Sequence, residues 1–208
     1  MNLLALETST AWCSVALKKE NIVLERSLLA PRQHSALLLP LIDELLKEAN
    51  LSLNELNAIA FGQGPGSFIG LRLSASVTQG LAFGSNLPVI PVSTLQILAQ
   101  TAYEQEGLTA VIAMIEAKVS AVYWGAYQVK EGLMQVVVPD QFSELEKINL
   151  SELDLGWERV GNIPALVKHQ IYPQARALLT LAEDQYLRGN RQPPEKAVPV
   201  YLQDRVVQ

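Results

Sequence analysis

The segment from Leu56 to Tyr103 carries a single charged side chain, Arg72, and this constrains the fold more than any other feature of the chain. A membrane-spanning helix would explain the lack of charge, but a span needs about 18 or more consecutive apolar residues. Every such window here is interrupted by polar residues and prolines, namely Ser74, Ser76, Thr78, Gln79, Asn86, Pro88 and Pro91. We therefore predict no membrane span, and burial of this segment on several sides by its own domain or by a partner.

The composition indicates a folded protein in a reducing compartment. The chain has 208 residues, 49% of them hydrophobic, which suffices for one large domain or two small ones. Its single cysteine, Cys13, forms neither an internal disulfide nor a cysteine-based metal site, and the start shows no secretory signal, so we expect a cytoplasmic protein. The net charge of −5 disfavours nucleic-acid binding by this chain alone, because phosphate neutralisation requires clustered Lys and Arg.

Apolar periodicity predicts alternating strands and helices in the first half. Short apolar runs bounded by polar turns indicate strands, and apolar residues at helical spacing indicate helices. Ser67 and Ser93 are candidate N-caps for the second and third helices. The predicted elements are strands over 3–6, 14–17, 22–28, 58–61 and 89–92 and helices over 35–49, 68–83 and 93–103.

The second half repeats this plan. Residues 113–116 echo residues 4–7 at an offset of 109, each a strand that ends in a glutamate. We therefore predict an α/β protein with two similar lobes, residues 1–105 and 106–208, built from a duplicated βββαβα unit. Its further predicted elements are strands over 121–129, 133–138 and 159–161 and helices over 143–148 and 175–187.

A glycine-rich loop at 62–70 lies between a predicted strand and a predicted helix, where free amides are able to cradle an anion. It is not a P-loop, because no Lys follows, and Ser67 replaces the third glycine of a dinucleotide motif. Pro65 excludes a nucleophile elbow. By spacing alone, anion binding and a tight packing turn are equally favoured. The candidate anion-binding residues are Glu7, Thr8, Gly64, Gly66 and Ser67.

The predicted helix over 68–83 is apolar nearly all round, so one sheet face cannot cover it. One side packs on its own domain, and the other needs a second helix or a partner. Arg72 is a candidate anchor for a partner's carboxylate or carbonyl. A central helix inside the chain is the alternative. Phe68, Leu71, Ala75 and Ala82 lie on one side, and Ile69, Leu73, Val77 and Gly80 lie on another.

Glu7 and Glu116 each end the first strand of one half. In a two-lobed fold they are candidates to face a shared cleft and hold a metal-bound nucleotide, whereas local capping or pairing is the simpler alternative. His34 and His169 form neither an HxxxH nor an HExxH motif. The residues therefore predict no catalytic group and no metal site.

Short motifs along the chain resemble the bacterial TsaB (YeaZ) family, which is related to the TsaD glycoprotease-like family. The match covers essentially the whole chain, and the block GPGSFIGLR at 64–72 is specific to this family and its relatives. The other motifs are LLALETST at 3–10, HS at 34–35 with LLP at 38–40, VSTL at 92–95, VYW at 122–124 and PVYL at 199–202.

The resemblance implies an actin-like, Hsp70-like ATPase (ASKHA) fold and a non-catalytic role. The family member pairs with a TsaD-like catalytic subunit, which it stabilises and activates, and with a TsaE-like ATPase. Together they transfer threonylcarbamoyl to N6 of the adenosine beside the anticodon, in tRNAs that read codons starting with A. Contact with tRNA is then expected only through the complex, and whether the chain alone forms a homodimer is left open by the sequence.

The resemblance also implies where the partner binds: helices 35–49 and 68–83 pack against their counterparts in the catalytic subunit. No cofactor of its own is implied, with ATP or ADP a candidate ligand only at the interface of the complex. The implied partner-contact residues are Phe68, Leu71, Arg72, Ala75 and Gln79 on one helix and Leu38, Leu41 and Leu45 on the other.

The chain departs from the usual family pattern at several positions. Glu7 and Ile69 stand where the family usually has Asp and Thr, Gln203 replaces an Arg, and residues 116–118 read EAK in place of DAR. None of these departures removes a catalytic group. The alternative function is a nucleotide-binding ATPase or kinase-like enzyme of the same fold. A metalloprotease is disfavoured because the chain has no histidine pair.

Overall fold

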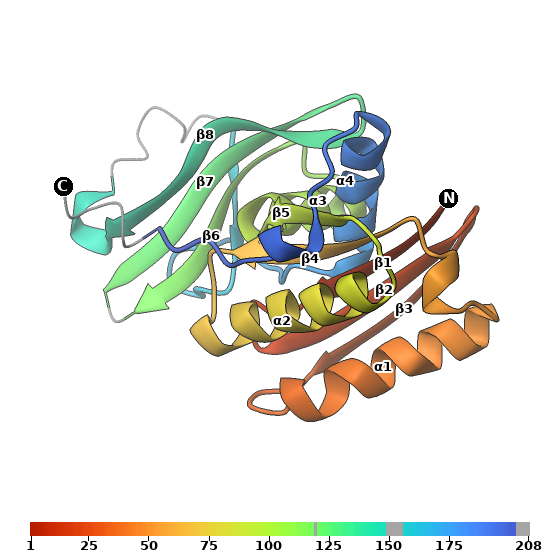
Figure 1. The fold of residues 1–208 in the computed structure, drawn as a ribbon. Helices are drawn as coiled ribbons and strands as arrows, with labels where there is room; N and C mark the ends of the chain where they lie inside the picture. Colours follow the sequence, from red (N-terminus) through yellow and green to blue (C-terminus); the bar gives the residue numbers. More distant parts are fainter. Residues whose placement is uncertain (119, 149–155, 203–208) are drawn as a thin grey trace.

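The computed structural model describes residues 1–118, 120–148 and 156–202, which form two five-stranded mixed sheets joined by helices (Figure 1). The strand order is β3-β2-β1-β4-β5 in the first sheet and β10-β9-β6-β7-β8 in the second. The first sheet comprises β1 (Asn2–Glu7), β2 (Trp12–Lys19), β3 (Ile22–Leu29), β4 (Ala58–Gly64) and β5 (Val89–Ser93). The second comprises β6 (Ala110–Lys118), β7 (Ala121–Lys130), β8 (Leu133–Glu144), β9 (Glu158–Gly161) and β10 (His169–Gln170).

The central strand β1 shows why the first sheet needs a covering layer on each face. It is antiparallel to β2 and parallel to β4, so both of its edges are paired. Its side chains alternate: Leu4 and Leu6 join the core on one face, and Leu3 and Ala5 join the core on the other. A strand buried on both faces is accordingly apolar at nearly every position.

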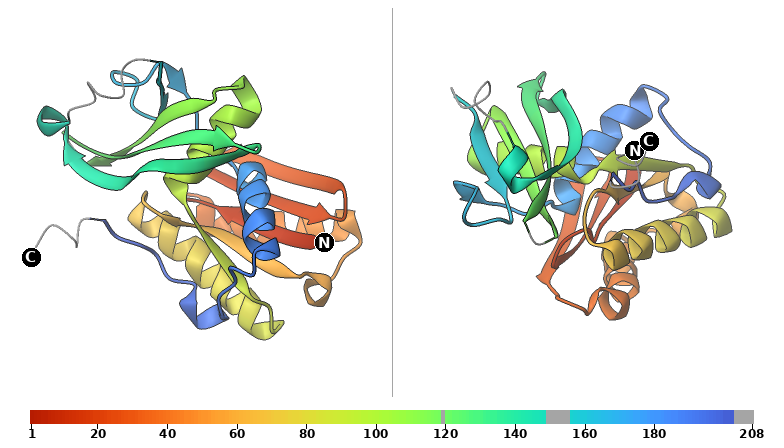
Figure 2. Two further views of the ribbon diagram at one scale, coloured as in Figure 1. Left: turned by 90° about the horizontal axis from the view of Figure 1, so that it is seen from above. Right: turned by 90° about the vertical axis from the view of Figure 1, so that its left-hand side faces the viewer.

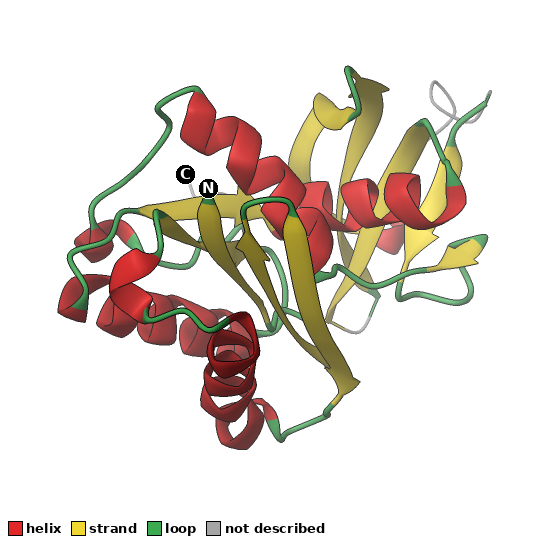
Figure 3. Cartoon of the chain, turned by 90° about the vertical axis from the view of Figure 1, so that its right-hand side faces the viewer, coloured by secondary structure: helices red, strands yellow, loops and turns green. Residues whose placement is uncertain are grey.

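Helices supply these layers. α1 and α2 cover one face of the first sheet, and α4 covers the opposite face (Figures 2 and 3). α3 packs on the second sheet. The α-helices are α1 (His34–Ala49), α2 (Phe68–Gly84), α3 (Thr94–Glu106) and α4 (Ala175–Leu187), and the 3₁₀ turns are η1 (Leu53–Glu55), η2 (Leu145–Lys147) and η3 (Pro194–Lys196).

Each sheet is covered on one face by a helix from the other half of the sequence. Leu95 and Leu98 of α3, from the first half, lie in the core of the second sheet. Leu178 and Leu181 of α4, from the second half, lie in the core of the first sheet. Each core therefore draws on both halves of the sequence, and the division at residue 105 stays a prediction.

The predicted fold class, two α/β lobes of similar construction, is confirmed. Taken from its β8 edge, the second sheet has the order β8-β7-β6-β9-β10, which matches β3-β2-β1-β4-β5 strand for strand. The helices are repeated less closely. Among the described residues, the second half has only the 3₁₀ turn η2 where α1 falls in the first half, and no helix between β9 and β10.

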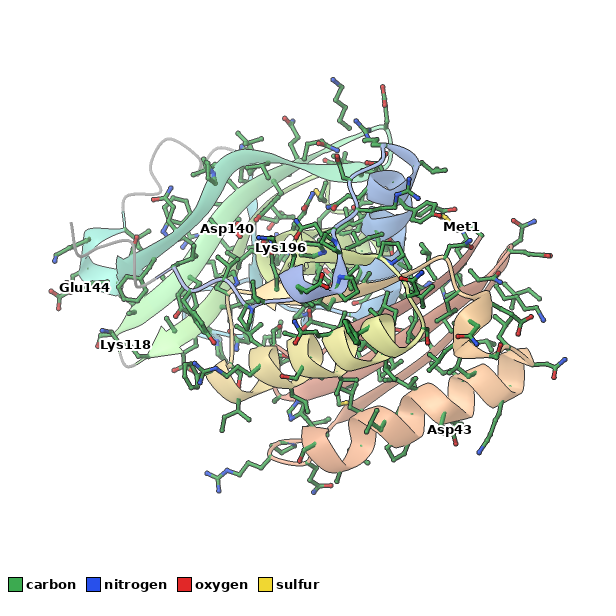
Figure 4. The ribbon with its side chains drawn as sticks, in the orientation of Figure 1. Met1, Asp43, Lys118, Asp140, Glu144 and Lys196 are labelled. Atoms are coloured by element: carbon green, nitrogen blue, oxygen red, sulfur yellow. The ribbon has the colours of Figure 1, made fainter. Side chains whose placement is uncertain are left out.

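The helix predicted over 143–148 is observed only as the 3₁₀ turn η2 over Leu145–Lys147, and the prediction is wrong for residues 143 and 144. β8 continues through Glu144, because its backbone pairs with β7, where Val122 lies opposite Ser143 and Ala121 opposite Glu144. Trp124 Nε1 also donates a hydrogen bond to Ser143 Oγ at 3.0 Å. Sheet pairing thus overrides the local sequence signal. Figure 4 shows Glu144 at the outer end of the second lobe, near Lys118.

Within the described part of the chain, no helix combines the length and hydropathy that crossing a membrane requires.

Candidate functional site: the inter-lobe cleft and the exposed face of α1 and α2

The glycine loop packs tightly against the turn that follows β1. Thr8 Oγ1 donates to the carbonyl of Gly70 at 2.8 Å, and the Ser67 amide donates to the carbonyl of Ser9 at 2.7 Å. A Cβ on Gly70 would lie 1.9 Å from the Thr8 carbonyl oxygen, and one on Gly66 would lie 2.6 Å from that of Ser9. These glycines are needed because two backbone segments touch here.

Glu7 is buried beside this loop, and only one of its carboxylate oxygens accepts a hydrogen bond from the described residues. Oε1 accepts the Ser9 amide at 2.6 Å, whereas Oε2 has no hydrogen-bond partner there. Oε2 lies against Gly62, 2.0 Å from where a Cβ would stand. Burial raises the pKa of Glu7 to about 7, an effect that the hydrogen bonds from Ser9 oppose.

The predicted anion-binding residues do come together, but the described loop is not an open cradle. Glu7 and Thr8 are almost fully buried, so neither faces a ligand. The amide of Ser67 is already bonded, and that of Gly70 donates to Ser67 Oγ at 3.3 Å, which caps α2. The prediction is corrected for Glu7 and Thr8, because both side chains are buried against the glycine loop and are not open to a ligand. Gly64, Gly66 and Ser67 stay predictions.

Two hollows lie between the lobes, on either side of the start of α2. The larger, about 670 Å³, is bounded by Ser9, His34 and Ile69 from the first lobe and by Glu116 and Asn162 from the second. Its wall is mainly apolar. Glu116 is exposed here, and its amide donates to Asn162 Oδ1 at 2.9 Å. Glu7 and Glu116 thus differ: one is sealed in the core, and the other faces the cleft.

The smaller hollow, about 370 Å³, holds an arginine stacked on aromatic rings. The Arg72 guanidinium carbon lies 3.4 Å from the centre of the Phe68 ring and 5.5 Å from that of Tyr201. The two rings are 5.6 Å apart. Arg72 is exposed, and no described carboxylate forms an ion pair with it. The ring faces hold the cation in place and leave its hydrogen-bond donors free.

Most of the implied partner-contact residues prove to be core residues. They lie on the apolar side of each helix that packs against the chain's own first sheet. Because they are buried there, they cannot touch a partner directly. Gln79 is half-buried, and its Nε2 donates to the carbonyl of Pro194 at 3.3 Å. Only Phe68 and Arg72 are exposed. The corrected residues are Leu38, Leu41, Leu45, Leu71 and Ala75, whose exposure ranges from 0 to 6%.

The large apolar residues that are exposed on α1 and α2 are different residues of the same helices. Ile69 and Phe83 of α2 are 79% and 70% exposed, and Leu39 of α1 is 51% exposed. Ile69, Arg72 and Phe83 share one face of α2 because they follow helical spacing. The second apolar side of the helix, which contains Ile69, already signalled this face in the sequence. We call Leu39, Phe68, Ile69, Arg72 and Phe83 the α1/α2 surface.

The described residues contain no group of three or more His, Cys, Asp or Glu placed to hold a metal ion. His34 Nε2 lies 3.2 Å from the carbonyl oxygen of Trp12, so the ring fixes the start of α1 against β2. His169 lies in the other lobe, on β10, beside Glu106. Gln203, the substituted family position near the C-terminus, lies outside the described residues.

The fold and the site define a two-lobed α/β protein whose two sheets share one strand order, with a cleft between the lobes and an exposed apolar helix face beside it. The family model described as TsaD, tRNA N6-adenosine threonylcarbamoyltransferase, matches residues 28–169. The TsaB protein of Escherichia coli is 35% identical over 99% of this chain and 96% of its own length. The chain belongs to the TsaB (YeaZ) family of tRNA threonylcarbamoyladenosine biosynthesis proteins, which confirms the resemblance.

Further relatives agree with this assignment. The TsaB protein of Haemophilus influenzae is 37% identical over 99% of this chain and 95% of its own length. The solved structure of YeaZ from Pseudomonas aeruginosa is 39% identical and superposes with a TM-score of 0.90, covering 97% of this chain and 99% of that one. The tRNA N6-adenosine threonylcarbamoyltransferase of Chromobacterium violaceum is 47% identical over 68 residues, which are 33% of this chain and 20% of that protein.

Proposed function

We propose that this chain is a non-catalytic subunit in tRNA threonylcarbamoyladenosine biosynthesis, and that it binds and activates a TsaD-like catalytic subunit. The observation that carries the proposal is the α1/α2 surface: four large apolar side chains and one arginine without an ion-pair partner among the described residues, exposed on adjoining helices. Exposed apolar side chains gathered on one face are typical of a protein-interaction site. The match of residues 28–169 to the transferase family supports a partner of similar architecture.

The likeness to the transferase supports a specific mode of binding. Two chains with related helices present related faces to each other, so a pseudo-symmetric contact between the α1/α2 surface and its counterpart is the geometry we propose. In this contact Ile69, Phe83 and Leu39 supply the buried apolar area. Arg72 supplies a charge-assisted hydrogen bond to a carboxylate of the partner. The same surface would carry a homodimer when the catalytic subunit is absent.

The proposal extends to the other members of the pathway. A TsaE-like ATPase joins the complex, and tRNA is held mainly by the partners, because this chain has a net charge of −5. The chain works in the cytoplasm, where tRNA is modified. ATP or ADP would bind at the interface of the complex, where the 670 Å³ hollow opens beside Ile69.

Charge reversal at Arg72 tests the proposed contact. Arg72→Glu should abolish co-elution with the TsaD-like subunit in size-exclusion chromatography, because it places a carboxylate against a carboxylate, and the far-UV spectrum should not change. Lys130→Glu, at the exposed last residue of β7, is the control and should co-elute like the unaltered chain. Co-elution of the Arg72→Glu variant at unchanged stoichiometry would rule out this surface.

The second candidate is a nucleotide-binding ATPase or kinase-like enzyme, which the 670 Å³ hollow between the lobes favours. Its volume lies in the range that small-molecule sites occupy. This candidate requires that the purified chain bind ATP and turn it over. Isothermal titration calorimetry with ATP and Mg²⁺ separates the two: our proposal predicts no heat of binding to the isolated chain, whereas micromolar binding with turnover would favour the enzyme.

A further inference from the structure

The C-terminal segment returns from α4 to the first lobe and ends beside the start of α2. Gln192 exchanges two backbone hydrogen bonds with Val89 on the free edge of β5, at 2.8 and 2.9 Å. The Val200 amide then donates to the carbonyl of Gln63 at 2.8 Å. Figure 1 shows this segment in dark blue, passing over β4 and alongside α2. Residues far apart in sequence are thus joined at the α1/α2 surface.

The segment fits closely against the glycine loop. A Cβ on Gly64 would lie 2.7 Å from the carbonyl oxygen of Val200, and Gly64 has a φ of +116°, which disfavours any residue with a side chain. Gln79 of α2 also donates to Pro194 within the segment. The backbone of residues 192–200 is therefore held at several points before it reaches Tyr201.

Tyr201 meets α2 through the face of its ring. The ring lies 5.6 Å from that of Phe68 and 5.5 Å from the guanidinium carbon of Arg72. Its hydroxyl is buried and has no hydrogen-bond partner in the described structure, so the hydroxyl adds nothing to the contact. The aromatic ring, rather than the phenol group, is what Arg72 requires.

We propose that Tyr201 is a positioning residue of the partner-binding surface: its ring packs against the Phe68 ring and flanks the Arg72 guanidinium stacked there, which holds that cation ready for a carboxylate on a partner's helix. This inference rests on the proposed function. A free arginine side chain samples many rotamers, and ordering it on binding costs affinity. Glu116 borders the same hollow and is a competing anion within the chain. Stacking on Tyr201 and Phe68 keeps the cation facing outward.

The test is a double-mutant cycle on the affinity for the TsaD-like subunit, measured by calorimetry at several salt concentrations. Tyr201→Leu should weaken binding about tenfold and flatten its salt dependence, and Arg72→Ala should have the same two effects. Tyr201→Phe, which keeps the ring, should bind like the unaltered chain. The double variant Arg72→Ala/Tyr201→Leu should bind no more weakly than Arg72→Ala alone, because Tyr201 acts only through Arg72.

Each outcome has a separate meaning. If the unaltered chain does not bind the TsaD-like subunit, the proposed function fails and the positioning role falls with it. If Arg72→Ala weakens binding but Tyr201→Leu does not, or if the two losses simply add, only the positioning role is overturned. Melting temperatures of all variants show whether they fold, and the salt dependence separates loss of an oriented charge from a general loss of stability.

Discussion

At the scale of single residues, Glu7 is a carboxylic acid whose ionisation depends strongly on the fold. Its pKa rises from 4.5 to about 7 because its carboxylate is buried. Since the pKa of Glu7 is higher in the folded state than in the unfolded state, the folded state is more stable when the Glu7 carboxyl is protonated and neutral. This contribution to stability is fully present below pH 4.5 and is lost as the pH rises through 7.

Glu7→Gln should therefore gain stability relative to the unaltered chain as the pH rises from 4.5 to 7. The shift corresponds to roughly 3 kcal/mol at most, and the difference should level off above pH 7. A constant offset between the two variants is also expected, because a buried amide leaves a donor unsatisfied. Urea unfolding at a series of pH values measures the difference, and parallel stability curves for the two variants would contradict the account.

At the scale of elements, two glycines of α2 have opposite roles. A Cβ on Gly70 would collide with the Thr8 backbone, whereas nothing lies within 4 Å of the position at Gly80. Gly70→Ala should therefore destabilise the chain by about 2 kcal/mol or more, and Gly80→Ala should stabilise it by about 0.5–1 kcal/mol. Thermal unfolding tests this pair, and equal effects at both positions would show that the loop does not pack as described.

The elements that the sequence predicts well are those whose periodicity is local. The helix predicted over 68–83 is observed as Phe68–Gly84 with its Ser67 cap, and the one over 175–187 is observed as Ala175–Leu187. Predictions from local patterns fail where hydrogen bonding to a neighbouring strand determines the secondary structure. Residues 143–144 are strand because β7 lies beside them, and the orientation of α2 depends on a sheet that its own residues do not reveal.

The same reasoning explains the error in the candidate site. The sequence shows two apolar sides on α2, but periodicity alone cannot say which one faces the sheet. The buried side includes Leu71 and Ala75, and the exposed side includes Ile69 and Phe83. The contact of Tyr201 with Arg72 could not be predicted either, because it joins residues that only the tertiary fold brings together.

At the scale of the whole molecule, the lobes are joined by more than the chain connection. α3 and α4 are exchanged between them, and a polar cluster links β5 to the second sheet. Ser93 Oγ and the Tyr127 hydroxyl both donate to the Asp140 carboxylate, and burial raises the pKa of Asp140. Asp140 lies on β8, above the centre of the molecule (Figure 4). The repeat in the sequence predicts two lobes but not this exchange, which depends on long-range packing.

The central claim is that this chain activates a catalytic partner through the α1/α2 surface and performs no chemistry itself. The most direct test is reconstituted transfer of threonylcarbamoyl to tRNA with a TsaD-like and a TsaE-like protein. Two variants are matched: Ile69→Asp on this surface and Leu187→Asp on α4, at residues 79% and 74% exposed. We predict full activity with Leu187→Asp and a loss of more than tenfold with Ile69→Asp or without the chain. Undiminished activity with Ile69→Asp, or in the absence of the chain, would contradict the account.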